Sequence, residues 1–252
     1  MDEHAPLCEQ CGYDIAGLET TGACPECGRP IVRSLAPSRS GSLWQNAPGF
    51  SSWWRTNLAV ATHPRELFSS LKVQMSRSSS LALINCLIAA AVLVAPWIGT
   101  LAGDPARAAR GESAALQVFT FAWVFVAQVA AVAFILLVLT WCEYQGIRFI
   151  AARRKWRLTR AAAWQVCCHA TIGWVAATLA PLFALAIIYT LRIILNLPMG
   201  SVIDLRKYGL GFTSVGGMLA VALPIVFVVM GLFVYELLVH LGVRANRFAA
   251  SL

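Results

Sequence analysis

Four cysteines near the N-terminus are the residues whose spacing points most directly to chemistry. Cys8 and Cys11 form one Cys-x-x-Cys pair, Cys24 and Cys27 form a second pair after twelve residues, and glycine follows each pair. Two residues between cysteines let a tight turn aim both sulfurs at one ion, and glycine accepts the positive φ angle of such a turn. Four thiolates are the ligand set that structural Zn²⁺ prefers. The pattern therefore predicts one structural zinc ion per chain, bound by these four cysteines.

The charge around this site argues against nucleic acid as its partner. Residues 7–28 carry Glu9, Asp14, Glu19 and Glu26 and contain neither lysine nor arginine. Affinity for nucleic acid depends on basic side chains that neutralise phosphates. A protein contact or a purely structural role is favoured, and a zinc site closed by four cysteines leaves no coordination position for a substrate. We therefore expect no catalytic residue here and a protein that is not an enzyme.

The composition of the rest of the chain indicates a membrane protein. Of the 252 residues 58% are hydrophobic and 13% are charged, whereas a soluble domain has about 25% charged residues. About 20 consecutive apolar residues are needed to cross the hydrocarbon layer as a helix. Four segments reach this length, at residues 81–101, 116–140, 170–191 and 212–239. The predicted fold is an all-α polytopic membrane bundle of four transmembrane helices with a small N-terminal zinc ribbon.

The distribution of lysine and arginine predicts the orientation in the membrane. The net charge is +8, with fifteen basic residues in the segments before the first span, between the second and third spans, and after the fourth. The other two loops hold four basic residues, and Arg192 lies at the end of the third span. The positive-inside rule then places both termini in the cytoplasm, and we expect a multi-pass protein of the bacterial cytoplasmic (inner) membrane. A reducing cytoplasm disfavours the alternative of two disulfides, while iron remains an alternative to zinc in a four-cysteine site.

Two segments separate the predicted zinc ribbon (residues 1–32) from the transmembrane domain (residues 81–252). Residues 33–52 are rich in Ser, Pro and Gly and predict a flexible linker. In residues 53–80, Pro64 favours a helix start, and Leu67, Leu71 and Met75 form one apolar stripe. This pattern predicts an amphipathic helix lying in the membrane interface, the alternative being a cytoplasmic helix packed on the bundle.

A basic loop between the second and third spans suggests contact with lipid. Arg153, Arg154, Lys155 and Arg157 surround Trp156. Basic clusters beside a membrane attract anionic lipid. The cluster is a candidate lipid-surface site, and the alternative is a determinant of topology only.

Polar residues in the spans define the remaining hypotheses. A small-solute or lipid transporter, or a transporter subunit, would need Asn85, Gln128 and Glu236 to line one cavity, because polar groups at membrane depth mark transport pathways. Cys167-Cys168-His169 resembles a metal or nucleophile cluster on paper. Consecutive helical residues point about 100° apart, so we expect packing residues there instead of a site.

Two resemblances add to this interpretation. The stretch CEQCGYDIAGLETTGACPECGRPI, residues 8–31, resembles the zinc ribbon at the N-terminus of many bacterial membrane proteins. It implies zinc at the four cysteines. The approach His63-Pro64-Arg65-Glu66-Leu67-Phe68 makes the membrane part weakly similar to the Yip-type membrane domain, a compact multi-span bundle.

Together the motifs predict a non-enzymatic membrane protein whose ribbon mediates protein interaction or membrane organisation. The expected partners are the lipid bilayer and a protein bound through the ribbon, with no nucleic acid, and the sequence leaves homo-oligomer formation open. The transporter is the alternative.

Overall fold

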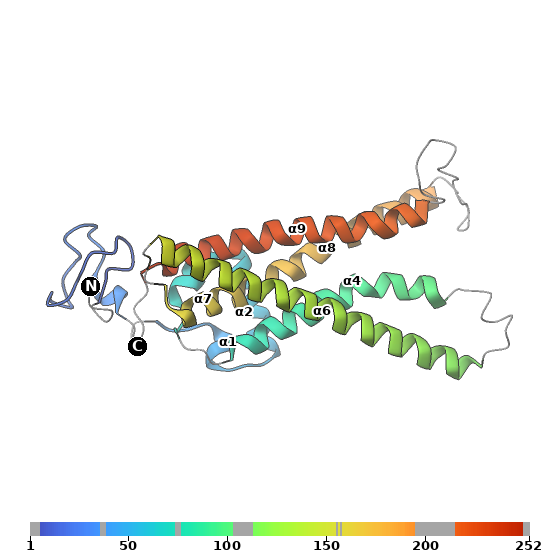
Figure 1. Ribbon diagram of the computed structural model, residues 1–252, viewed down its shortest axis with the longest axis horizontal. Coiled ribbons are helices and arrows are strands. Elements are labelled where there is room, and N and C mark those ends of the chain that lie inside the picture. Colours follow the sequence, from blue (N-terminus) through green and yellow to red (C-terminus); the bar gives the residue numbers. More distant parts are fainter. Residues whose placement is uncertain are drawn as a thin grey trace. The chain divides into compact units, whose positions relative to one another are not determined.

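The computed structural model describes residues 6–35, 39–73, 77–102, 113–154, 156, 158–194 and 215–248 of the chain (Figure 1). Its helices are η1 (Ile31–Ser34), α1 (Leu43–Asn46), α2 (Phe50–Thr62), α3 (Pro64–Ser70), α4 (Ser78–Ala102), α6 (Ala114–Arg153), α7 (Arg160–Ala170), α8 (Ile172–Ile194) and α9 (Val215–Asn246). In the described residues, β-type pairing is limited to two isolated antiparallel bridges, Leu7 with Asp14 and Ala23 with Pro30. The structure is helical apart from the cysteine-bearing segment.

Two compact units share the long helices. One consists of Met1–Cys86, Ala133–Ile172 and Tyr235–Leu252. It holds the cysteines, the short helices α1, α2, α3 and α7, and one end each of α4, α6 and α9. The other consists of Leu87–Val132 and Gly173–Val234, and its described helical segments belong to α4, α6, α8 and α9.

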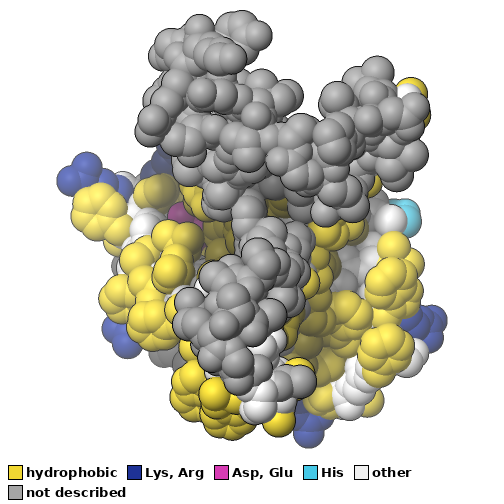
Figure 2. All heavy atoms as spheres, turned by 90° about the vertical axis from the view of Figure 1, so that its right-hand side faces the viewer, with side chains coloured by type: hydrophobic (Ala, Val, Ile, Leu, Met, Phe, Trp, Pro, Cys, Tyr) yellow, Lys and Arg dark blue, Asp and Glu magenta, His cyan; other side chains and the backbone are white. Residues whose placement is uncertain are grey.

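Four helical stretches in the described residues are long and apolar enough to cross a membrane, which confirms this part of the predicted fold. They are Ser78–Ala95, Ala115–Arg153, Arg160–Phe183 and Ile225–Asn246. In the most apolar window of the second stretch only 11% of the residues are buried. Figure 2 likewise shows many hydrophobic side chains on the surface of the described residues. So large an exposed apolar surface is unusual for a protein in water and typical of one that contacts lipid.

The helix boundaries differ from the predicted spans because hydropathy detects only the apolar centre of a helix. Helix α6 continues past the predicted end at Thr140 to Arg153. Before the third span, the Thr159 side chain caps α7 by accepting a hydrogen bond from the Ala162 N–H at 3.1 Å. Thr171 then separates α7 from α8. The first residues of the predicted fourth span, 212–214, lie outside the described part of the chain.

The predicted flexible linker differs from the structure in its described residues. Helix α1 begins with a capping box, in which the Ser42 hydroxyl accepts from the Gln45 N–H and the Gln45 side chain accepts from the Ser42 N–H. Trp44 in the same helix is only 5% exposed. Composition missed this segment because its order comes from caps and from a few buried side chains, and not from a periodic apolar pattern.

The predicted amphipathic region, residues 53–80, contains most of α2, all of α3 and the first residues of α4. Pro64 occupies the first turn of α3, as predicted, but α3 ends at Ser70 and Leu71 has an extended backbone. The stripe is therefore interrupted, and its last member, Met75, lies outside the described residues. Phe68 and Leu71 are buried, and Phe68 lies against Gly242 of α9. Helix α3 packs on the end of α9, and its position in the membrane interface stays a prediction.

Substitution of Gly242 by alanine tests this packing. A Cβ atom there would lie 2.5 Å from Val166 Cγ1 and 3.0 Å from Phe68 Cδ1, so Gly242→Ala should destabilise the protein by about 1–3 kcal/mol through overpacking. The control is Gly146→Ala in α6, where a Cβ atom meets nothing within 4 Å and alanine should stabilise the helix by up to about 1 kcal/mol. Thermal unfolding in detergent measures both. Equal midpoints for the two variants would contradict the packing.

Candidate metal centre

The first Cys-x-x-Cys pair lies on a tight turn closed by backbone hydrogen bonds. The Cys8 N–H donates to the Tyr13 carbonyl at 2.8 Å, and the Gly12 N–H donates to the Cys8 carbonyl at 2.8 Å. Gly12 has a φ angle of 80°, a left-handed conformation that glycine adopts without strain. The glycine after the pair thus has the role expected from the sequence.

The second pair repeats the same turn. The Cys24 N–H donates to the Arg29 carbonyl and the Gly28 N–H to the Cys24 carbonyl, both at 2.8 Å, and Gly28 has a φ angle of 71°. Ile15 and Ile31, each 3% exposed, pack with Cys8 and Cys24 in a small core. Two equivalent turns over one small core bring the cysteine sulfurs of both halves together.

The four sulfurs form a cluster of the size that a metal ion needs. All four Sγ atoms lie within 4.8 Å of one another. Cys8 Sγ is 3.5 Å from Cys27 Sγ, and Cys11 Sγ is 3.6 Å from Cys24 Sγ. A tetrahedron with zinc–sulfur bonds of about 2.3 Å has edges of about 3.8 Å, whereas a disulfide joins its sulfurs at about 2.05 Å. The arrangement suits a metal ion, and all four cysteines are free in this structure.

The thiols respond differently to their surroundings. Burial raises the pKa of Cys8, but hydrogen bonds from the backbone of Cys11 and Gln10 outweigh it and lower the pKa to about 6. Desolvation and the neighbouring sulfurs raise the pKa of Cys11 to about 12. The backbone N–H donors therefore favour the thiolate form of Cys8. The close approach of the sulfurs opposes ionisation of all four thiols at once. A bound cation removes that repulsion, because thiolates are the form that coordinates metal.

Metal analysis of the purified protein should find one ion per chain. Cys24→Ser should lose most of it, because three thiolates hold a structural metal much more weakly than four. Cys142→Ser, which changes an exposed cysteine of α6, is the matched control and should retain the full amount. Full metal content in the Cys24→Ser protein would rule out the four-cysteine site.

A buried ion pair ties the metal-site segment to the helices. Glu9, between two of the cysteines, is 4% exposed, and Arg39 is 5% exposed. The Arg39 guanidinium donates to Glu9 Oε1 from Nη2 at 2.6 Å and from Nε at 3.1 Å. Arg29 donates to Glu9 Oε2 at 3.3 Å, and the Glu9 N–H donates to Ser34 Oγ at 3.2 Å. A buried carboxylate requires such partners, because burial of an unpaired charge is costly.

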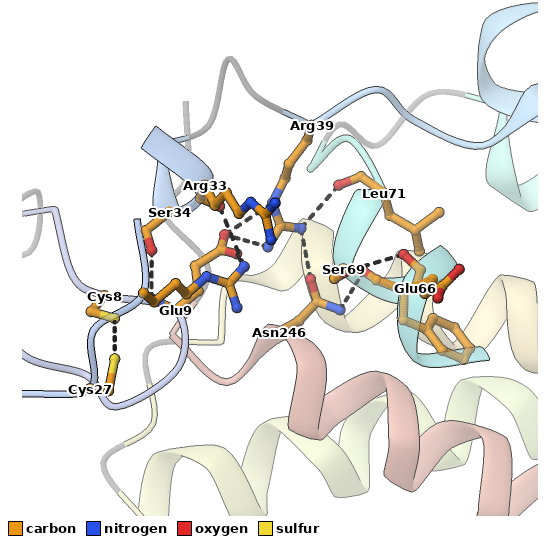
Figure 3. Close-up of polar contacts among 12 residues, drawn as sticks. Cys8, Glu9, Cys27, Arg33, Ser34, Arg39, Glu66, Ser69, Leu71 and Asn246 are labelled. Atoms are coloured by element: carbon orange, nitrogen blue, oxygen red, sulfur yellow. Dashed lines mark hydrogen bonds and ion pairs between the residues drawn. The ribbon is translucent and has the colours of Figure 1, made fainter. Parts of the chain in front are cut away.

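Arg39 continues this network to α9, as Figure 3 shows. Its Nη1 donates to Asn246 Oδ1 at 2.7 Å and to the Leu71 carbonyl at 3.0 Å. Asn246, 2% exposed, donates in turn to the Phe68 carbonyl at 3.0 Å and to the Gly242 carbonyl at 2.9 Å. The end of α9, the end of α3 and the cysteine-bearing segment therefore meet at one buried guanidinium.

Two further contacts hold the first cysteine turn against the end of α9. Arg247 Nη2 donates to the Gln10 carbonyl at 2.8 Å. A Cβ atom at Gly12 would lie 2.9 Å from the Phe248 ring, so this glycine also permits a close approach. The sequence pattern did not identify Glu9, Arg39 or Asn246, because pairing between residues so distant in the chain leaves no local signal.

Removal of the buried guanidinium should release the metal-site segment without unfolding it. Arg39→Gln leaves the Glu9 carboxylate with only the longer ion pair to Arg29, at 3.3 Å. Removal of one partner of a buried ion pair costs about 3–5 kcal/mol of stability. We expect rapid proteinase K cleavage between residues 32 and 45, with the metal retained. Arg33→Gln, at an exposed arginine of η1, should leave cleavage unchanged. Equal protection of both variants would show that the ion pair does not hold the segment.

The structure describes each of the three polar residues of the transporter hypothesis. Asn85 is fully buried and bonded on both sides of its amide. Its Oδ1 accepts from Trp53 Nε1 at 2.8 Å and from Asn57 Nδ2 at 3.1 Å, and its Nδ2 donates to Thr171 Oγ1 at 3.1 Å. Gln128 and Glu236 are exposed. Asn85 links α2, α4 and Thr171, in line with the interhelical bonding expected of such amides.

Cys167, Cys168 and His169 are buried in the core, as expected for packing residues. His169 Nδ1 lies 2.9 Å from the Gln165 carbonyl, so Nδ1 carries the proton. Its Nε2 then accepts from the Ser42 hydroxyl at 3.1 Å. The imidazole thus supports the residue that caps α1, and both ring nitrogens have partners.

The basic cluster after α6 is described only in part. Arg153 stacks over Phe149 at 4.6 Å and Arg154 over Trp156 at 5.2 Å, measured to the ring centroids. Both arginines are exposed. Lys155 and Arg157 lie outside the described residues, and contact of this cluster with lipid stays a prediction.

Comparisons with known proteins do not assign the site. No protein-family model matches the chain, and searches among curated proteins and among solved structures find no match. Interpretation of the metal centre therefore depends on its geometry and chemistry.

Proposed function

We propose that the chain is a non-enzymatic, multi-pass protein of the bacterial cytoplasmic membrane in which a structural zinc ribbon recruits a protein partner to the membrane. The single observation that carries this proposal is the closed cluster of Cys8, Cys11, Cys24 and Cys27, whose sulfurs all lie within 4.8 Å. Four thiolates complete the tetrahedral coordination of zinc and leave no position for a substrate. The resemblance of residues 8–31 to bacterial zinc ribbons supports zinc over iron.

The exposed surface of the ribbon supports a protein as the partner. Tyr13, Leu18 and Val32 are 40%, 39% and 52% exposed. Exposed acidic residues, Glu19 and Glu26 among them, share this segment with the apolar side chains. Aromatic side chains are enriched in protein interfaces, and the buried centre of an interface is more apolar than its rim, while the acidic charge disfavours a nucleic acid.

The attachment of the ribbon supports a role at the membrane. The Glu9–Arg39 pair and the Asn246 side chain hold the ribbon at the end of α9. The predicted orientation places this end in the cytoplasm, since the segments around it carry most of the basic residues. A partner bound to the ribbon would then be held next to the cytoplasmic face of the membrane.

Proximity labelling from the N-terminus in the native cell tests the proposal. The intact protein should label a specific partner, and Tyr13→Ser/Leu18→Ser should lose it with the zinc retained, because only the exposed apolar side chains change. Cys24→Ser should lose both partner and zinc. The matched control is Leu43→Ser, at an α1 residue that is 44% exposed, and it should label the same partner. If all variants labelled the same set of proteins, the ribbon would not recruit a partner and its role would be structural only.

A further inference from the structure

A basic cleft lies beside the Arg39 network, and its wall is formed by residues of the ribbon, of α3 and of the end of α9. Its volume is about 700 Å³. The charged residues of its wall are Glu9 and Arg29 from the ribbon, Arg65 and Glu66 from α3, and Arg244 and Arg247 from the end of α9. Four guanidinium groups therefore face two carboxylates. All of these residues belong to one compact unit.

The two carboxylates do not neutralise this cleft. Within the described part of the chain, the recorded ion pairs involve Glu9 alone, with Arg29 at 3.3 Å and Arg39 at 2.6 Å. Arg39 already balances the charge of Glu9 from its buried side. Arg65, Arg244 and Arg247 have no carboxylate partner within ion-pair distance among the described residues, and Glu66 is exposed. The cleft thus keeps an excess of positive charge.

The wall also contains donors that the protein does not use. Arg247 donates from Nη2 to the Gln10 carbonyl, and Arg29 from Nη2 to Glu9. The Nε atoms of both side chains are buried, so a ligand in the cleft reaches instead the exposed guanidinium groups of Arg65 and Arg244. Guanidinium groups present several donors in a planar fork that matches the oxygens of a phosphate. An anion with several oxygen acceptors would therefore complete this wall.

We propose that this cleft binds a phosphate monoester, carried by a lipid headgroup or by a small soluble molecule. A dianionic phosphate would offset the excess positive charge and accept charge-assisted hydrogen bonds from several arginines at once. The fourth membrane-length stretch ends at Asn246, between Arg244 and Arg247. The cleft thus lies where apolar helix gives way to polar chain, the level at which lipid phosphates meet basic side chains. Bound phosphate would bridge the ribbon, α3 and α9.

The test titrates the purified full-length protein, with its metal, against two probes. Native mass spectrometry in detergent measures binding of phosphatidic acid, and isothermal titration calorimetry measures binding of inorganic phosphate. Arg65→Gln/Arg244→Gln removes two cleft arginines that are exposed and take no part in the Glu9 network. At about 1 kcal/mol per basic residue, affinity should fall by about 25-fold. Metal content and helicity serve as checks on folding.

The matched control is Arg55→Gln/Arg160→Gln, which removes the same charge from exposed arginines outside the cleft and outside the candidate lipid-surface cluster. It should change the affinity less than threefold. Phosphatidic acid binding without phosphate binding identifies a lipid headgroup, and phosphate binding without phosphatidic acid binding identifies a soluble ligand. Binding of either probe, or of both, supports the site when only the cleft variant weakens it. Equal losses in the two variants, or no binding of either probe, would overturn the proposal.

Discussion

The buried carboxylate of Glu9 is the interaction on which the arrangement of the ribbon depends. Glu9 lies between two predicted metal ligands, so the turn that presents Cys8 and Cys11 also presents this charge. Because an unpaired carboxylate cannot remain buried at low cost, the Arg39 guanidinium must lie next to it, and Arg39 brings Asn246 and Leu71 into the same network. The metal site and the helix ends thus share one set of hydrogen bonds.

This coupling has consequences for both parts of the protein. The cysteine-bearing segment has almost no apolar core beyond Ile15 and Ile31, so a metal ion bound by the four cysteines would supply much of its stability. The ends of α3 and α9, for their part, close over a buried guanidinium that needs an acceptor from the ribbon. The same contacts also shape the basic cleft, whose wall is complete only while the ribbon is in place. A ligand in that cleft and a metal in the ribbon would therefore stabilise the same arrangement.

Local patterns predicted much of this structure. The four cysteines lie together because two Cys-x-x-Cys turns, each followed by glycine, form from residues close in the chain. The four membrane-length helices followed from long apolar runs, since the bilayer imposes their length. The boundaries were less accurate: α6 continues to Arg153 because a helix does not end where hydropathy falls. The linker was also wrong in part, since the Ser42 cap and the burial of Trp44 order α1 without any periodic pattern.

By itself the sequence determined the cluster of four cysteines that could hold a metal ion, the number of long apolar helices and the acidic character of residues 7–28, because each depends on residue type and short spacing. Only the tertiary structure decided that the ribbon is attached to the helix ends, that Asn85 bonds to Trp53, Asn57 and Thr171, and that arginines from three separate segments face one cleft. Those outcomes depend on pairs of residues far apart in the chain. Burial selects such pairs through the cost of unpartnered charge and polar atoms, and that cost exists only once the chain has folded.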